Sequence, residues 1–106
     1  MKLTSACLTS TAMVATATLR WNASLKLNKK STIRSAAENF NTTARQIRTT
    51  AKGAADKEYT KLVGAVARDM ETMASQNAAG KAIVSGTASS SDSSALATYC
   101  QKKVVG

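Results

Sequence analysis

The sequence predicts a mainly α-helical protein in which one long amphipathic helix, continuous or broken, occupies about residues 31–79. Apolar residues recur there at helical spacing. The 106 residues also include no proline, and 20 of them are alanine, the strongest helix former. We expect three segments: a basic N-terminal arm over 1–30, the long helix over 31–79, and a Ser/Gly-rich linker with a short helix within 80–106.

The apolar content is small for a private core. Leu, Ile, Val and Phe together number 17 of the 106 residues, and the other aromatic side chains are one Trp and two Tyr. A domain of this length has to bury well over half of its unfolded surface, and each alanine contributes little apolar area. The composition therefore predicts a single domain whose apolar stripe depends on neighbouring subunits.

The residue inventory argues against catalysis. The chain has no histidine, which is the usual near-neutral general base and the commonest metal ligand. Its two cysteines, Cys7 and Cys100, lie near opposite ends, and its five glycines form no phosphate-binding motif. We therefore expect no enzymatic activity, no metal and no cofactor.

The N-terminal third carries most of the positive charge. Residues 1–37 contain six basic side chains and no acidic one, within a stretch rich in Ser, Thr and Ala. This composition is typical of an organelle-import leader and favours a mitochondrial location. The alternatives are a secretory signal ending near residues 15–17 and an ordinary structural arm. A membrane span is disfavoured because seven Ser or Thr residues interrupt residues 3–19.

The conformation of the arm is ambiguous. Its apolar residues fit a two-residue alternation as well as a helical stripe that includes Cys7, Val14 and Trp21. Because alanine is abundant, we favour a helix over 3–19, followed by a turn at 22–24.

The long helix has the strongest periodicity. Six apolar residues from Ile33 to Ala51 follow steps of 4, 3, 4, 3 and 4, which is a heptad pattern. A further four-residue step to Ala55 resembles a stutter, and the alternative is two antiparallel helices broken near Lys52 and Gly53. The N-cap is expected at Ser31 and the end at Gly80. The expected helix-packing contacts are Ile33, Phe40, Ile47, Tyr59, Leu62, Val66, Met70 and Met73.

A continuous helix of this size would extend about 70 Å, too far for the remaining residues to enclose it. We therefore expect it to pack against other subunits of an assembly. A homo-oligomer joined through the same seam is an alternative.

A basic face accompanies the seam. The net charge of +9 favours an anionic partner, which could be an acidic protein surface, nucleic acid or an anionic lipid surface. The expected contacts to such a partner are Lys26, Lys29, Lys30, Arg34, Arg45, Arg48 and Lys52.

The C-terminal segment predicts a linker over 80–94 and a short helix over 95–103, capped by Asp92 or Ser94. Residues 82–84 fit a brief strand. Since nothing in the sequence brings Cys7 and Cys100 together, we expect free thiols.

These features together predict a non-catalytic structural or accessory subunit of a large assembly, organellar in the favoured interpretation. The alternative is a basic nucleic-acid-binding or coat subunit of a virus or filament. A secreted helical protein is a third possibility.

Overall fold

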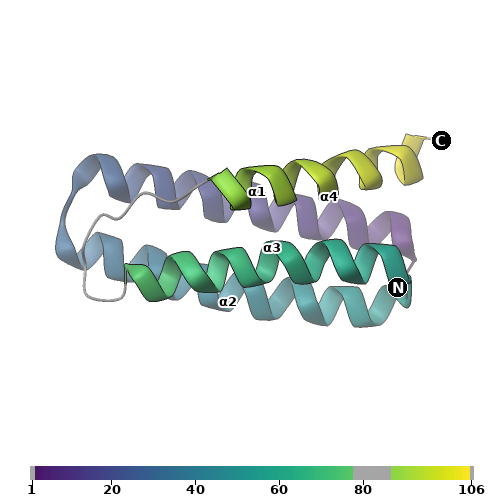
Figure 1. Cartoon of the computed structure of the whole chain (residues 1–106), viewed down its shortest axis with the longest axis horizontal. Helices are drawn as coiled ribbons and strands as arrows, with labels where there is room; N and C mark the ends of the chain where they lie inside the picture. Colours follow the sequence, from purple (N-terminus) through teal and green to yellow (C-terminus); the bar gives the residue numbers. More distant parts are fainter. Residues whose placement is uncertain (1, 78–86, 106) are drawn as a thin grey trace.

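Four antiparallel helices form a bundle in the computed structural model, which describes residues 2–77 and 87–105. The helices are α1 (Leu3–Leu27), α2 (Lys30–Ala54), α3 (Lys57–Gln76) and α4 (Thr87–Val105). Successive helices run in opposite directions (Figure 1), so that α1 packs against α2 and α4, and α3 packs against the same two helices. The bundle measures 42 × 20 × 17 Å. Its longest dimension is close to the length of a single 25-residue helix. The predicted mainly α-helical fold class is confirmed, and the described residues form four helices.

The expected helix over 31–79 is broken into α2 and α3. Ala55 adopts a left-handed conformation (φ 54°), and its N–H bonds to the Ala51 carbonyl. Asp56 then caps α3, because its carboxylate accepts a hydrogen bond of 2.8 Å from the Tyr59 N–H. The continuous helix was therefore wrong, and the broken alternative placed the break slightly early, since Gly53 still lies within α2. The step that resembled a stutter is the turn itself.

The N-terminal arm is the 25-residue helix α1, which is longer than the expected 3–19. The turn expected at 22–24 is absent; α1 ends instead at Asn28, which is left-handed (φ 50°). The hydroxyl-rich sequence is compatible with a helix because its side chains bond to their own backbone: Thr11 to the Cys7 carbonyl at 2.7 Å, and Thr18 to that of Val14 at 2.8 Å. These hydroxyls are thus satisfied without leaving the helix.

The C-terminal helix is also longer than expected. It begins at Thr87, so Asp92 and Ser94 lie within α4 and do not cap it. The N-cap expected at Ser31 is also displaced, since α2 begins at Lys30. The end expected at Gly80 and the strand expected at 82–84 fall outside the described residues.

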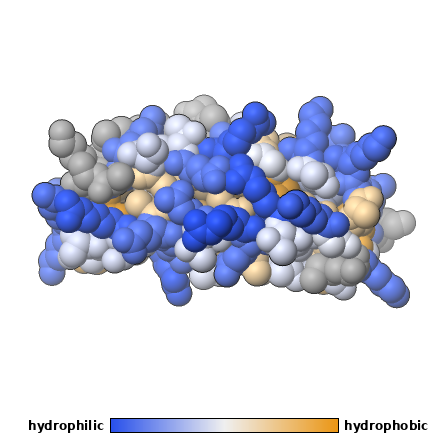
Figure 2. All heavy atoms as spheres, turned by 90° about the horizontal axis from the view of Figure 1, so that it is seen from below, coloured by the Kyte–Doolittle hydropathy of each residue, from blue (hydrophilic) through white to orange (hydrophobic). Residues whose placement is uncertain are grey.

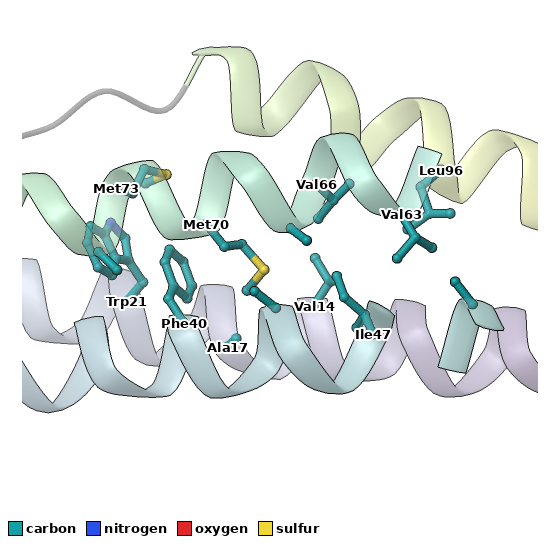
Figure 3. Packing of buried hydrophobic residues seen from close by; sticks show 14 of the residues in the cluster. Val14, Ala17, Trp21, Phe40, Ile47, Val63, Val66, Met70, Met73 and Leu96 are labelled. Atoms are coloured by element: carbon teal, nitrogen blue, oxygen red, sulfur yellow. The ribbon is translucent and has the colours of Figure 1, made fainter. Parts of the chain in front are cut away.

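The core is continuous along the bundle and draws on all four helices. Trp21 of α1 stacks on Phe40 of α2, with ring centroids 4.4 Å apart and planes within 3° of parallel. Figure 3 shows this pair at one end of a row of buried side chains that leads past Met70 and Val66 towards Leu96 of α4. Alanines between the larger residues let the helices approach closely. The apolar stripe of α2 and α3 is therefore covered by the chain's own α1 and α4, contrary to the expected dependence on other subunits.

A disulfide bond between Cys7 and Cys100 joins α1 to α4, with the two Cα atoms 5.4 Å apart. The expectation of free thiols was wrong. It was based on the absence of any sequence feature that brings the two cysteines together, whereas the up-down-up-down order of the helices places the start of α1 beside the end of α4 (Figure 1). Because the two residues are 93 positions apart, the crosslink closes a long loop and lowers the entropy of the unfolded chain, which stabilises the fold by about 4–5 kcal/mol in the chain-entropy treatment.

We predict that reducing this disulfide lowers the free energy of unfolding by about 2–4 kcal/mol, which is below the chain-entropy value because measured effects of disulfides are typically smaller than that treatment gives. Urea titrations followed by circular dichroism, with and without dithiothreitol, measure the change. A Cys7→Ser/Cys100→Ser double variant provides the control, since its midpoint should match the reduced protein and ignore the reductant. Equal midpoints for the oxidised and reduced wild-type chain would contradict the prediction.

Candidate functional site

No group of three or more His, Cys, Asp or Glu side chains suited to a metal ion occurs among residues 2–77 and 87–105. Across those same residues, none of the helices is long and apolar enough to cross a membrane.

The side chains expected to contact other subunits lie inside the bundle. Seven of the eight are at most 7% exposed, and Leu62 is half-buried against the same core. They do pack helices together, but the helices belong to their own chain. While the bundle is folded, these residues are closed to a partner, so any docking surface has to be built from others.

The expected cationic contacts lie on the surface of α2, at the end of α1 and in the turn between them. Six of the seven are exposed. The exception is the half-buried Arg48, whose guanidinium holds the Glu71 carboxylate of α3 through two hydrogen bonds of 2.7 Å. This pairing lowers the pKa of Glu71 and raises that of Arg48. Arg48 thus links α2 to α3, which leaves six of the expected cations for a partner.

Positive charge is concentrated in the first half of the bundle. Residues 1–55, which include α1 and α2, carry nine basic side chains and one acidic, Glu38, for a net charge of +8. Residues 56–106 carry six basic and five acidic side chains, a net charge of +1. Figure 2, which views the bundle from the α2–α3 side, shows hydrophilic side chains over most of that face. The α1–α2 hairpin is therefore the strongly basic part of the molecule.

The outer face of α1 carries an apolar stripe that the bundle does not cover. Leu8, Leu19 and Leu27 are 60%, 71% and 59% exposed. With the exposed alanines at positions 12, 15 and 23, they follow steps of 4, 3, 4, 4 and 4, so all six lie along one side of the helix. The inner stripe, which includes Cys7, Val14 and Trp21, faces the core. Sequence reasoning found the inner stripe and missed the outer one, although the same spacing test would have detected it.

A groove runs between α1 and α2 beside this stripe. It consists of two adjoining hollows of about 360 and 290 Å³. The first is lined by Ala23 and Leu27 of the stripe and by serines of α2, and the second is lined by Ala12 and Gln46. Arg20 and Asn39 line both hollows.

The side-chain oxygen of Asn39, in the middle of the groove, is buried and has no hydrogen-bond partner within the described chain. A buried polar atom without a hydrogen bond costs free energy in the folded chain.

The opposite end of the bundle is held by polar contacts around the disulfide. The buried Tyr59 hydroxyl donates to the Ala6 carbonyl at 2.9 Å and lies 2.7 Å from the Ser10 hydroxyl. The Tyr99 hydroxyl donates to the Asp56 carboxylate at 2.8 Å, and the Lys103 ammonium lies 5.4 Å from the Tyr99 ring centroid. Each polar group here has a partner within the chain, so this end is a structural feature.

A pair of carboxylates lies between α3 and α4. Burial, and then the neighbouring carboxylate of Asp92, raises the pKa of Asp69 to about 6. One of the Asp69 oxygens is buried and accepts no hydrogen bond from the described residues. Two ionised carboxylates offer only acceptors to each other, and a proton between them removes both the repulsion and the unmet acceptor.

We predict that the protein becomes more stable as the pH falls from about 7 towards 5. Between the unfolded pKa of Asp69, 3.8, and its folded value of about 6, the folded state binds more protons than the unfolded state, so acidification favours folding. Below this window the trend reverses, because Asp56 and Glu71 have lowered pKa values in the folded state.

An Asp69→Asn variant should be more stable than the wild type at pH 7, by about 1 kcal/mol after allowance for solvent screening at this half-buried site. It should also lose the rise in stability towards pH 5. Urea midpoints at pH 5, 6 and 7 for both proteins measure the effect. If the stability of the two proteins changed with pH in the same way, the raised pKa of Asp69 would not be the cause of the pH dependence.

Comparison with protein-family models, with curated proteins and with solved structures finds no significant match to this chain.

Proposed function

We propose that the protein is a non-catalytic accessory subunit of a larger assembly, which it joins through the α1–α2 hairpin. The observation that carries this proposal is the uneven charge, +8 over residues 1–55 and +1 over residues 56–106. A fold needs no such asymmetry, and it weakens the bundle slightly through repulsion. It is useful for attracting and orienting an acidic surface.

The bundle supports a binding role through rigid presentation of the hairpin. The Trp21–Phe40 stack fixes α1 against α2, and the disulfide fixes α1 against α4. A surface held in this way loses little conformational entropy when a partner binds. The disulfide also supports a role in an oxidising compartment, where such bonds persist.

The proposal changes the expected mode of association. The side chains of the heptad seam are already used inside the chain, so other subunits meet the exposed cations and the outer face of α1. A nucleic-acid-binding role is the alternative that the same cations favour, and it is distinguished below by nuclease treatment.

We predict that reversing three charges on α2 releases the chain from its assembly. In the variant Lys30→Glu/Arg34→Glu/Lys52→Glu, all three positions are exposed. The matched control Lys57→Glu/Lys61→Glu/Lys102→Glu alters three exposed lysines at comparable positions of α3 and α4. Both variants shift the net charge equally, so only the location of the change differs.

The measurement is size-exclusion chromatography of extracts from the native cells, with detection of the tagged chain. The wild type and the control should elute well ahead of a free chain of 11.1 kDa, and the α2 variant should elute at the free mass. The proposal fails if the wild type elutes as the free chain or if both variants behave alike. Release of the wild type by nuclease would establish the nucleic-acid alternative in its place.

A further inference from the structure

We propose that the groove between α1 and α2, together with the outer stripe of α1, binds an acidic amphipathic helix of a partner protein. This inference deepens the proposed function by naming the chemistry of the partner that the hairpin recognises. It is carried by three features that coincide on one face: an uncovered apolar stripe, a groove of helical dimensions and a concentration of cations.

The uncovered stripe indicates that the partner buries apolar surface. Leu19 and Leu27 are more than half exposed, and each would contribute to binding if it were removed from water. The alanines between the leucines are small enough for another backbone to approach closely. Leucines alternating with small residues along a helix form a surface into which the side chains of a second helix can fit.

The dimensions of the groove match a helix of a few turns. The α1 residues that line its two hollows run from Ala12 to Leu27. This segment is about 22 Å long at 1.5 Å per residue, which accommodates about four turns of a partner helix. Helix-in-groove binding with apolar anchors at positions i, i+3, i+4 and i+7 is an established way of recognising such a segment.

The charge around the groove specifies an acidic partner. Arg20 lines both hollows, and Lys26 lies seven residues after Leu19, two turns along the same face of α1. Lys30 and Arg34 are exposed on the adjoining part of α2. A second copy of this chain is a poor occupant, because it would bring another hairpin with a net charge of +8.

The same features distinguish a protein helix from other anionic partners. Nucleic acid would use the cations but would gain nothing from exposed leucines. A lipid acyl chain would cover the leucines, but it carries no charge to pair with Arg20, which lines both hollows. The side chains of an amphipathic acidic helix can supply apolar contact and negative charge together.

The experiment uses the full, oxidised chain and a fluorescein-labelled peptide of about 18 residues, with leucines on one helical face and glutamates on its flanks. Fluorescence anisotropy gives its Kd. One control peptide has the same composition with the leucines distributed around the helix. The variants are Leu19→Gln/Leu27→Gln and Arg20→Glu, and the matched control is Val104→Gln, an exposed apolar residue on α4. Circular dichroism verifies that each variant folds.

We expect the amphipathic peptide to bind and the scrambled one to bind at least about tenfold more weakly. The double leucine variant should raise Kd about tenfold or more, Arg20→Glu should weaken binding, and Val104→Gln should change Kd by less than about twofold. The inference is overturned if no binding occurs, if both peptides bind equally, or if the leucine variant binds as tightly as the wild type.

Two further probes test the other occupants. Vesicles of phosphatidylcholine and phosphatidylserine and a DNA duplex are tested with the same variants. The inference is also overturned if the Leu19→Gln/Leu27→Gln variant weakens the binding of either probe more than it weakens the binding of the peptide. If the leucine variant keeps its place in the native assembly while the α2 charge variant loses it, the groove inference fails and the proposed function stands. If the wild type is found free in the native extract, the proposed function fails first.

Discussion

The covering of the α2–α3 stripe by α1 and α4 is the constraint on which the rest of the structure depends. A chain with few large apolar side chains achieves this because its alanines let four helices pack closely, while the larger residues, such as Phe40 and Met70, are placed where the helices meet. The disulfide then makes the arrangement less costly in entropy, since it joins the first helix to the last. Without α1 and α4, the stripe would be open to water.

The parts that the sequence predicted well are those with a single dominant pattern. The heptad steps from Ile33 onwards indicated α2 and α3, because each of these helices has one apolar side. Helix α1 was difficult to predict because it has apolar residues on both its inner and outer sides, with hydroxyls between them. The turn between α2 and α3 lies where Asp56 caps α3, and this capping hydrogen bond is seen only in the three-dimensional structure. The disulfide could not be predicted from the sequence, because Cys7 and Cys100 come together only through the antiparallel order of the four helices.

The candidate site was also predicted only in part. The basic side chains could be predicted as surface residues from the composition of the chain, and six of the seven expected ones are exposed. The structure added their context, because Arg48 is paired with Glu71. Lys30 and Arg34 are the neighbours in sequence of Ser31 and Ser35, which line the groove, and the cation that lines the groove itself is Arg20. The apolar residues expected at the interface proved to be the core. The exposed stripe, with Leu8, Leu19 and Leu27, lies on the opposite side of α1 from the buried stripe that includes Val14 and Trp21. A self-sufficient core thus frees other residues for binding.

Amide hydrogen exchange of the isolated, oxidised chain, read residue by residue by NMR with the mass determined by sedimentation equilibrium, tests the central claim most directly. A chain that covers its own stripe should be a monomer of 11.1 kDa, with amides around Val14 and Trp21 of α1 protected as strongly as those around Ile47 and Val66. Rapid exchange throughout α1 while α2 and α3 remain protected, or protection that appears only on self-association, would contradict the account.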